Sequence, residues 1–517
     1  MRPTLLFLLA LAVSPALAQD YVIGAERGGG TASDVGEDAA VDVAGNTAVV
    51  GTFEGTATFG TVSLTSAGQG DFFVVKYDSQ RQPLWARRGG TSVFNDFAEG
   101  VAFDGDGNVF VAGYFTGVAT FDGGDNPDTT LTTRSDFDAF LAKYDPNGNL
   151  LWVRQGGGVG QDTGRGIALD DEGNAYFGGG YEGTAWFEAD TLTSAGSSDG
   201  FLVKYAPDGA VLWARSVGGP ESDGIWNVAV SDERVGDVIA AVGTFRGVAF
   251  FGTIPMQSRG NSDLFAFRID PQGSVVWAQQ VGGGGFDYGR GIDVVGFGGV
   301  YVTGSFEGTI LVGTDVLTSA GASDVLVAQL DESSGALQWG RRGGGAGFDI
   351  GNDLALSYPC CAGVSVAVTG YIDAGPSTFD APNQTLTLTS RGFTDGFFVD
   401  YMDGDVLDGT LIGGTNADRG WGIGSAPHFG RLALTGAFRG AAQAGTFTLT
   451  SVGSNDVYVV TIDDCRVRVC GDANEPDAEG SSLRLLLASM NPARGDVVLS
   501  LTTDRPQPVV AEVFDAL

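Results

Sequence analysis

The sequence predicts an all-β fold, a seven-bladed β-propeller. A Gly-Gly pair followed by an Asp recurs seven times, at intervals of about 60 to 70 residues, and a fixed period of this length indicates a repeat architecture. Short β-rich segments alternate with Asp-Gly and Gly-Asn turns, which is typical of hairpins. No stretch shows a helical period. The repeats begin near Gly28, Gly89, Gly156, Gly218, Gly282, Gly343 and Gly413.

Acidic residues recur at fixed places in the repeats. Positions that every repeat shares are predicted to serve the scaffold rather than a ligand. The aspartates that follow the Gly-Gly pairs are Asp34, Asp96, Asp162, Asp223, Asp287, Asp349 and Asp418. A second series follows Leu-Thr-Ser-like segments and comprises Asp71, Asp136, Asp199, Asp263, Asp324, Asp395 and Asp456. Five repeats also carry a Trp in their last strand, namely Trp85, Trp152, Trp213, Trp277 and Trp339.

One repeat of four short strands cannot bury both faces of its sheet, whereas radial packing of several repeats can. The linear alternative, a β-solenoid, typically has coils shorter than these repeats and lacks their hairpin turns. The segment 21–29 aligns in phase with residues 84–90, so we expect the N-terminal strand to complete the last blade and close the ring. The rival for that place is the segment 466–469.

The start of the chain predicts a secretory signal peptide over residues 1–18. Arg2 precedes an apolar run, and Ala16 and Ala18 supply a cleavage site of small residues. We expect residues 19–464 to form the propeller, 465–480 an acidic linker, and 481–517 a short tail. These expectations make the mature protein secreted or bound at the outer cell surface.

The net charge of −35 makes an acidic protein that repels nucleic acids and anionic membranes. After residue 18, no apolar run reaches the ~18 residues needed for a transmembrane helix. The expected partners are therefore the export machinery and an extracellular ligand, either a glycan or a protein.

Four cysteines occur in a chain expected to be exported, where disulfides can form. Cys465 and Cys470 enclose a short loop and are the disulfide candidate. Cys360 and Cys361 are adjacent, and the spacing alone leaves three connectivities open.

Positions that vary at one place in the repeat are free to bind a ligand. Three residues after each Gly-Gly aspartate lies such a position, at the expected innermost strand near the mouth of the central channel. Two Trp and two Arg there can stack on sugar rings or hold an anion; alternatively, the residues only fill the rim. They are Glu37, Glu99, Arg165, Trp226, Arg290, Asn352 and Trp421.

No catalytic residues stand out in the sequence. The only histidine, His428, rules out a histidine-rich metal site. The abundant carboxylates leave a two-carboxylate glycosidase or lyase open. No cofactor is expected apart from calcium, for which the irregular acidic loop with Asp122, Asp125 and Asp128 is the candidate.

Two segments resemble known families. The motifs Gly-Gly-x-x-x-Asp, Lys-Tyr-Asp-x-x-Gly and Val-Tyr-Val-Thr-Gly (300–304) resemble a bacterial β-propeller repeat family of exported proteins, which implies the fold but no chemistry. The tail, with Met490-Asn491-Pro492 and alternating apolar residues up to Leu517, resembles the start of a type IX secretion C-terminal sorting domain. That family continues with further strands, so the resemblance implies a truncated, partial β-sandwich.

The leading expectation is an exported, non-enzymatic propeller for binding or adhesion. The alternative is a secreted carbohydrate-active enzyme, a glycoside hydrolase or lyase, using carboxylates at the channel mouth.

Overall fold

The computed structural model describes residues 22–231, 238–295, 298–357, 364–426, 430–463, 484–491 and 496–502. Contacts divide the chain into a larger unit, Met1–Pro359 with Gly363–Cys465, and a smaller unit, Cys360–Ala362 with Arg466–Leu517. All regular structure in the described ranges is β-strand. The predicted signal peptide, the acidic linker, His428 and the four cysteines lie outside these ranges.

The larger unit consists of groups of four antiparallel strands, which we number 1 to 7 in chain order. Group 1 contains β2 (Asp34–Val41), β3 (Thr47–Phe59), β4 (Val62–Tyr77) and β5 (Pro83–Gly90). Group 2 contains β6 (Phe97–Phe103), β7 (Val109–Phe121), β8 (Thr129–Tyr144) and β9 (Leu150–Gly158). Group 3 contains β10 (Thr163–Leu169), β11 (Ala175–Phe187), β12 (Asp190–Tyr205) and β13 (Val211–Val217). Group 4 contains β14 (Gly224–Val230), β15 (Ile239–Phe245), β18 (Asp263–Ile269) and β19 (Val275–Val281).

The remaining groups repeat this order. Group 5 contains β20 (Tyr288–Val295), β21 (Gly299–Phe306), β24 (Asp324–Leu330) and β25 (Leu337–Gly344). Group 6 contains β26 (Ile350–Ser357), β27 (Ser365–Asp373), β30 (Thr394–Met402) and β31 (Asp405–Gly414). Group 7 contains β32 (Arg419–Ser425), β33 (Arg431–Phe438), β36 (Asp456–Asp463) and β1 (Val22–Gly30).

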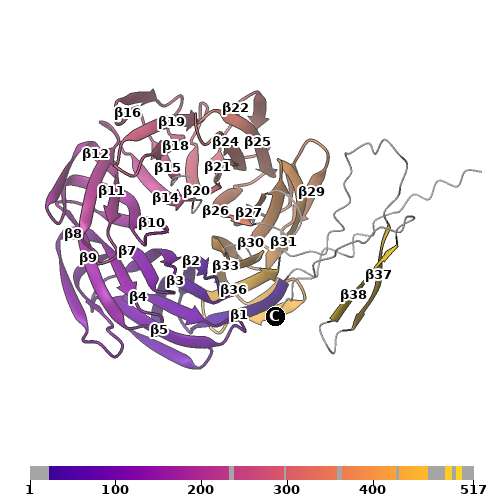
Figure 1. The fold of residues 1–517 in the computed structure, drawn as a ribbon, viewed down its shortest axis with the longest axis horizontal. Coiled ribbons are helices and arrows are strands. Elements are labelled where there is room, and N and C mark those ends of the chain that lie inside the picture. The colour runs from indigo at the N-terminus through magenta and orange to yellow at the C-terminus, as the bar shows by residue number, and fades with distance from the viewer. Residues whose placement is uncertain are drawn as a thin grey trace, which may run out of the picture. The chain divides into compact units, whose positions relative to one another are not determined.

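The groups of the larger unit follow one another around a common centre (Figure 1). Their first strands contact each other in the order β2, β6, β10, β14, β20, β26 and β32, and β32 in turn contacts β2. The apolar core lies between neighbouring groups; for example, Phe72 of group 1 packs against Phe121 and Phe140 of group 2. Both faces of each sheet are therefore buried, which explains the nearly continuous apolar runs in the middle strands.

Strand β1 is far in sequence from its partner strand β36. Arg27 lies opposite Tyr458 and Gly28 opposite Val457, and the Arg27 guanidinium reaches the carboxylate of Asp456 at 2.5 Å. The N-terminal segment therefore supplies the fourth strand of group 7. The rival segment 466–469 lies outside the described residues.

The Gly-Gly pairs lie where the fourth strand of one group meets the next group, at its second strand or at the hairpin strand that follows it. Gly28 is opposite Phe59, Gly156 opposite Phe187, and Gly343 opposite Phe379. In each case the phenylalanine ring lies against the glycine, and a Cβ atom there would overlap it. At these boundaries glycine thus allows one group to pair with the next.

A hairpin carries this contact at the outer edge of each group. In groups 1 to 3 the hairpin continues the second and third strands. Elsewhere it is formed by β16 (Val248–Phe251) with β17 (Ile254–Gln257), β22 (Thr309–Val312) with β23 (Asp315–Thr318), β28 (Pro376–Asp380) with β29 (Thr385–Thr389), and β34 (Ala441–Ala444) with β35 (Phe447–Thr450).

The aspartates after the Gly-Gly pairs hold backbone N–H groups at the group boundaries. Asp162 accepts one hydrogen bond from the N–H of Gly158 at 2.6 Å and another from Glu182 at 3.3 Å. Asp223 does the same with Gly219 and Arg246. The other five occupy equivalent positions: Asp34, Asp96, Asp287, Asp349 and Asp418.

The second aspartate series contains one wrong assignment. Asp71 accepts a hydrogen bond from the N–H of Ala67, four residues earlier. In group 2 the residue in this role is Asp138, which is buried and accepts from Arg134, whereas the predicted Asp136 is exposed. Counting from the first acid after the Leu-Thr-Ser-like segment selected the wrong carboxylate, because Asp136 precedes the residue that faces the core.

The recurrent tryptophans fasten each group to the turn of the next. The Trp213 indole donates a hydrogen bond to the carbonyl of Pro271, and the Arg215 guanidinium donates to Gly273 while stacking on Trp213. Trp85 and Arg87 hold the turn of group 2 in the same way. The pattern Trp-x-Arg is therefore an inter-group clamp.

The smaller unit contains one described hairpin, formed by β37 (Arg484–Asn491) and β38 (Asp496–Thr502). Arg484 lies opposite Thr502, and Asn491 opposite Asp496. The predicted resemblance of this segment to a sorting domain stays a prediction.

Candidate functional site

Each first strand contains a β-bulge at the position predicted to bind a ligand. In β2 the register shifts between Gly36 and Asp38, which leaves Glu37 without a cross-strand partner. A bulge re-aims a side chain without breaking the strand. The bulges contain Glu37, Glu99, Arg165, Trp226, Arg290, Asn352 and Trp421.

These seven residues, one from each group, line a single cavity of about 100 Å³, which we call the central site. Asp38, Asn227 and Asp353, each one residue further along its strand, also line it. The repeat period in the sequence therefore selected residues that are more than 380 positions apart in the chain, from Glu37 to Trp421, and that lie together in the structure. The bulges themselves were not predicted, because the residue at the bulge differs in type from one group to another and so gives no recognisable sequence signal.

The two central arginines lie on the same tryptophan. The Arg165 guanidinium carbon is 3.8 Å from the centroid of the Trp226 ring, and that of Arg290 is 4.9 Å away. Arg165 also forms an ion pair with Glu99 at 3.4 Å. Trp226 thus positions guanidinium groups, and Trp421, whose ring contacts Tyr371 edge-on, is the other aromatic side chain at the site.

Two buried polar atoms of the central site have no hydrogen-bond partner among the described residues. One is Nε of Arg290, a donor, and the other is Oδ1 of Asn352, an acceptor. The amide nitrogen of Asn352 donates to the carbonyl of Gly420 at 2.7 Å, which fixes Oδ1 in place. Because unpaired buried polar groups are costly, these atoms indicate a place for a bound polar group or water.

Carboxyl groups in the central site hold protons more tightly than usual. Burial raises the pKa of Glu37 to about 8, helped by the charge of Glu99 and opposed by Arg165. Burial likewise raises the pKa of Asp38 to about 7 and that of Asp353 well above its ordinary value. Near neutral pH, Glu37 is therefore mostly a neutral hydrogen-bond donor, which leaves the arginine charges less opposed.

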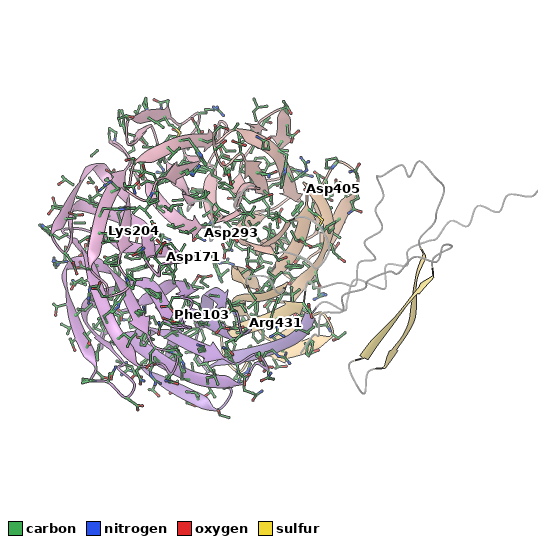
Figure 2. The ribbon with its side chains drawn as sticks, in the orientation of Figure 1. Phe103, Asp171, Lys204, Asp293, Asp405 and Arg431 are labelled. Carbon is green, nitrogen blue, oxygen red and sulfur yellow. The ribbon has the colours of Figure 1, made fainter. Side chains whose placement is uncertain are left out.

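A second cavity of about 480 Å³ adjoins the central site, because both are lined by Asp38, Asn227 and Asp353. Asp171 and Asp293 also line it, and Figure 2 shows them beside the centre of the larger unit. The second cavity is therefore acidic, in contrast to the arginine-containing central site.

The calcium candidates lie together on one loop, and two of their three carboxylates accept hydrogen bonds from the backbone. Asp122 accepts a hydrogen bond from the N–H of Gly124 at 2.9 Å, and Asp128 accepts from Gly123 at 3.0 Å. Within the described ranges, no group of three or more His, Cys, Asp or Glu side chains is arranged to hold a metal ion. A calcium site at Asp122, Asp125 and Asp128 stays a prediction.

Comparisons with known proteins agree with the repeat architecture. A WD repeat-containing protein of Acanthamoeba polyphaga mimivirus is 26% identical over 155 residues, which are 28% of this chain and 11% of the viral protein. The regulatory protein FlaEY of Caulobacter vibrioides is 30% identical over 177 residues, 32% of this chain and 18% of that protein. The chain thus spans less than a fifth of the length of either relative. No protein-family model matches it.

WD repeats build β-propellers. The four-stranded groups around a common centre give the chain an all-β repeat architecture of the β-propeller type, and this similarity agrees with it.

Solved structures resemble the chain only loosely. Quinohemoprotein alcohol dehydrogenase from Comamonas testosteroni has a TM-score of 0.41 and 11% identity, covering 93% of this chain and 81% of its own. Virginiamycin B lyase from Staphylococcus aureus has a TM-score of 0.35 and 7% identity, covering 82% and 94%. Phage phi92 endosialidase has a TM-score of 0.36 and 9% identity, covering 96% and 76%. At these values the similarity says nothing about ligand or reaction.

No helix in the described part of the chain is long and apolar enough to cross a membrane.

Proposed function

We propose that the chain is an exported seven-bladed β-propeller, closed by β1, that binds a ligand at the central site without catalysis. The seven groups are then the blades, and the protein acts as a binding or adhesion module outside the cell or at its outer surface. The observation that carries the proposal is the convergence of the seven variable bulge residues on one cavity, in which Arg290 Nε and Asn352 Oδ1 have no partner in the described ranges.

The central site favours a ligand with both a charged and a neutral polar group. Arg290 offers a donor to an anion, and Asn352 offers an acceptor to a hydroxyl. Small volume limits the bound part to a terminal group or a single functional group of a larger ligand. The export route in this proposal follows the signal peptide and the sorting-domain resemblance, both inferred from sequence.

A glycan array followed by calorimetric titration tests the proposal. Arg290→Gln and Trp421→Ala should each weaken binding of the best ligand about tenfold or more. Arg439→Gln, which changes an exposed arginine of group 7, is the matched control and should bind normally. A ligand that binds all of these variants equally would place its site elsewhere on the protein.

The second candidate is a carbohydrate-active enzyme, and one observation favours it. Glu37, whose pKa is raised to about 8, lies in the same cavity as Glu99, which pairs with Arg165. A neutral carboxyl beside a paired carboxylate is the combination that glycosidases use as acid and base or nucleophile. A polysaccharide hydrolysis panel separates the two functions. Turnover that Glu37→Gln abolishes, but the exposed Glu54→Gln does not, would replace the binding-only function.

A further inference from the structure

A groove leads outward from the central site between groups 3 and 4, and we call it the lateral groove. It has a volume of about 330 Å³ and shares Arg165 and Trp226 with the central site. We propose that the lateral groove binds an acidic oligosaccharide whose terminal group enters the central site. This inference rests on the proposed function and names its ligand class.

Small residues lie at the groove between groups 3 and 4. At one cross-strand position beside the bulge, group 2 carries Phe97 opposite Tyr114, and their rings stack at 4.8 Å. Group 3 has Thr163 opposite Gly180 at the same position, and group 4 has Gly224 opposite Thr244. A Cβ atom on Gly224 would meet nothing within 4 Å, so the space there is open. The groove therefore lies where two adjacent groups both carry glycine and threonine at this position.

Unpaired polar groups line the groove. Thr244 is 9% exposed, and its hydroxyl has no partner in the described ranges. The Arg246 guanidinium lies 5.9 Å from the centroid of the Phe286 ring and donates no hydrogen bond within those ranges. Thr244, on β15, and Arg246, in the turn that follows, thus offer a hydroxyl and a guanidinium that form no hydrogen bond within the described ranges.

The groove carries one arginine, Arg246, that no acidic side chain of the described ranges pairs with. Arg165 is already paired with Glu99, and the acidic lining residue Glu182 accepts a hydrogen bond from the N–H of Gln161. The other acid, Asp223, uses both oxygens on backbone N–H groups. Two arginines in one groove are notable in a chain with 28 basic and 63 acidic residues. An acidic ligand can therefore be held here in spite of the overall negative charge.

The lining favours a sugar over a peptide. Besides the arginines it carries hydroxyl groups and two aromatic residues, Trp226 and Tyr288, whereas its one aliphatic side chain, Ile225, is fully buried. Aromatic rings can stack on sugar rings, and hydroxyls with an arginine suit the hydroxyls and carboxylates of a uronic acid. The inferred ligand occupies both the lateral groove and the central site, two cavities that share Arg165 and Trp226, hence an oligosaccharide rather than a single sugar.

Binding of hexagalacturonate, measured by calorimetry, tests the inference against its methyl-esterified counterpart, which keeps the hydroxyls and loses the charges. The acidic form should bind at least about tenfold more tightly. Arg246→Gln should remove about tenfold of that affinity, and Gly180→Tyr, which restores the residue type of group 2, should block binding. Arg439→Gln is the matched control, because Arg439 occupies the place of Arg246 in group 7 and likewise donates its N–H to the repeated aspartate.

The outcomes separate the two proposals. Equal binding of the esterified sugar, or normal binding by Arg246→Gln, would overturn the acidic assignment while leaving the central site intact. Binding of hexaglutamate in place of both sugars would overturn the glycan class. Absence of any ligand for the central site on the glycan array and in protein-binding tests would remove the proposed function together with this inference. Arg246→Gln keeps the test decisive even if Gly180→Tyr fails to fold.

Discussion

Arg81 and Glu26 form an ion pair that joins group 1 to strand β1, with Nε of Arg81 3.4 Å from Oε1 of Glu26. At the boundary between groups 3 and 4, the direction is reversed: Arg215 lies on the strand and reaches the turn carbonyl of Gly273. At β1, the glycine Gly24 stands where a tryptophan stands in other fourth strands, and the Arg81 side chain lies against it. At the boundary made by the N-terminal strand, the arginine therefore comes from the turn and its acceptor from the strand, the reverse of the arrangement between groups 3 and 4.

Placing arginine at position 26 and glutamate at position 81 together should restore the ion pair of Arg81 with Glu26 in reversed orientation. Glu26→Arg and Arg81→Glu should each lower the free energy of unfolding by about 0.5 to 1 kcal/mol, because the pair is partly exposed and water screens it. The double variant should recover at least half of the summed loss. Urea unfolding of the four proteins gives the coupling energy. Simple additivity of the two losses would mean that the pair contributes nothing.

Removal of residues 21–27 should destabilise the larger unit. It exposes the edge of β36 and leaves the buried carboxylate of Asp456 without Arg27. We expect the melting temperature to fall by about 5 °C or more. Differential scanning calorimetry measures this change.

A chain that lacks residues 466–517 is the matched control for that deletion and should melt like the full protein. If the control melts lower and the N-terminal deletion does not, the segment 466–469 rather than β1 stabilises group 7.

Stability should decrease as the pH rises from about 5 to about 8. Burial raises the pKa of Asp34, Asp96, Asp223 and Asp287 from 3.8 to about 6, and that of Asp162 to about 7. A carboxyl with a raised pKa binds more protons in the folded chain, so its stabilising effect is complete below about pH 4 and is lost as the pH rises through the folded value. Urea unfolding at several pH values measures the slope.

The variant Asp162→Asn tests the assignment of this slope, because an amide does not titrate. It should be less stable overall but should show a smaller loss between the two pH values. Asp145 and Asp331 have lowered pKa values and titrate below this range. Stability that increases from about pH 5 to about pH 8 would contradict the prediction.

Gly157 should tolerate no side chain. Its φ is 141°, and a Cβ atom would lie 2.8 Å from Oδ2 of Asp162 and 3.0 Å from Cγ of Asp138. Gly157→Ala should therefore lower the free energy of unfolding by about 3 kcal/mol or more. Gly105→Ala, where a Cβ would meet nothing within 4 Å, should change it by less than about 0.5 kcal/mol. Equal unfolding curves for the two variants would contradict this account.

Much of the fold could be predicted because the same contacts recur. The Gly-Gly pair faces a phenylalanine ring or buried aspartates at the boundary, and the aspartate after it has to reach two backbone N–H groups, so both survive as a visible period. The phase of the N-terminal segment likewise matched the pairing of Arg27 with Tyr458. The choice of Asp136 instead of Asp138 was wrong because two acids were close together and only burial distinguishes them.

The candidate site was only half visible in the sequence. The seven variable residues could be found because they share one place in the period. Their projection into one cavity depends on bulges, and the lateral groove depends on what is missing, such as the aromatic side chain that Gly180 and Gly224 lack. Comparing each repeat with the next for unusually small residues would have pointed to it.

The pairing of β1 with β36 orders the events of synthesis. Arg27 is among the first residues of the larger unit to be made, yet its partner Asp456 follows 429 residues later. Until the last repeat has been translated, β1 has no β36 beside which to pair, and the first and last groups cannot be joined. The larger unit therefore lacks this pairing for almost the whole of its synthesis. The pairing of β1 with β36 is therefore a late step of folding, which requires that all the repeats between them have been synthesised.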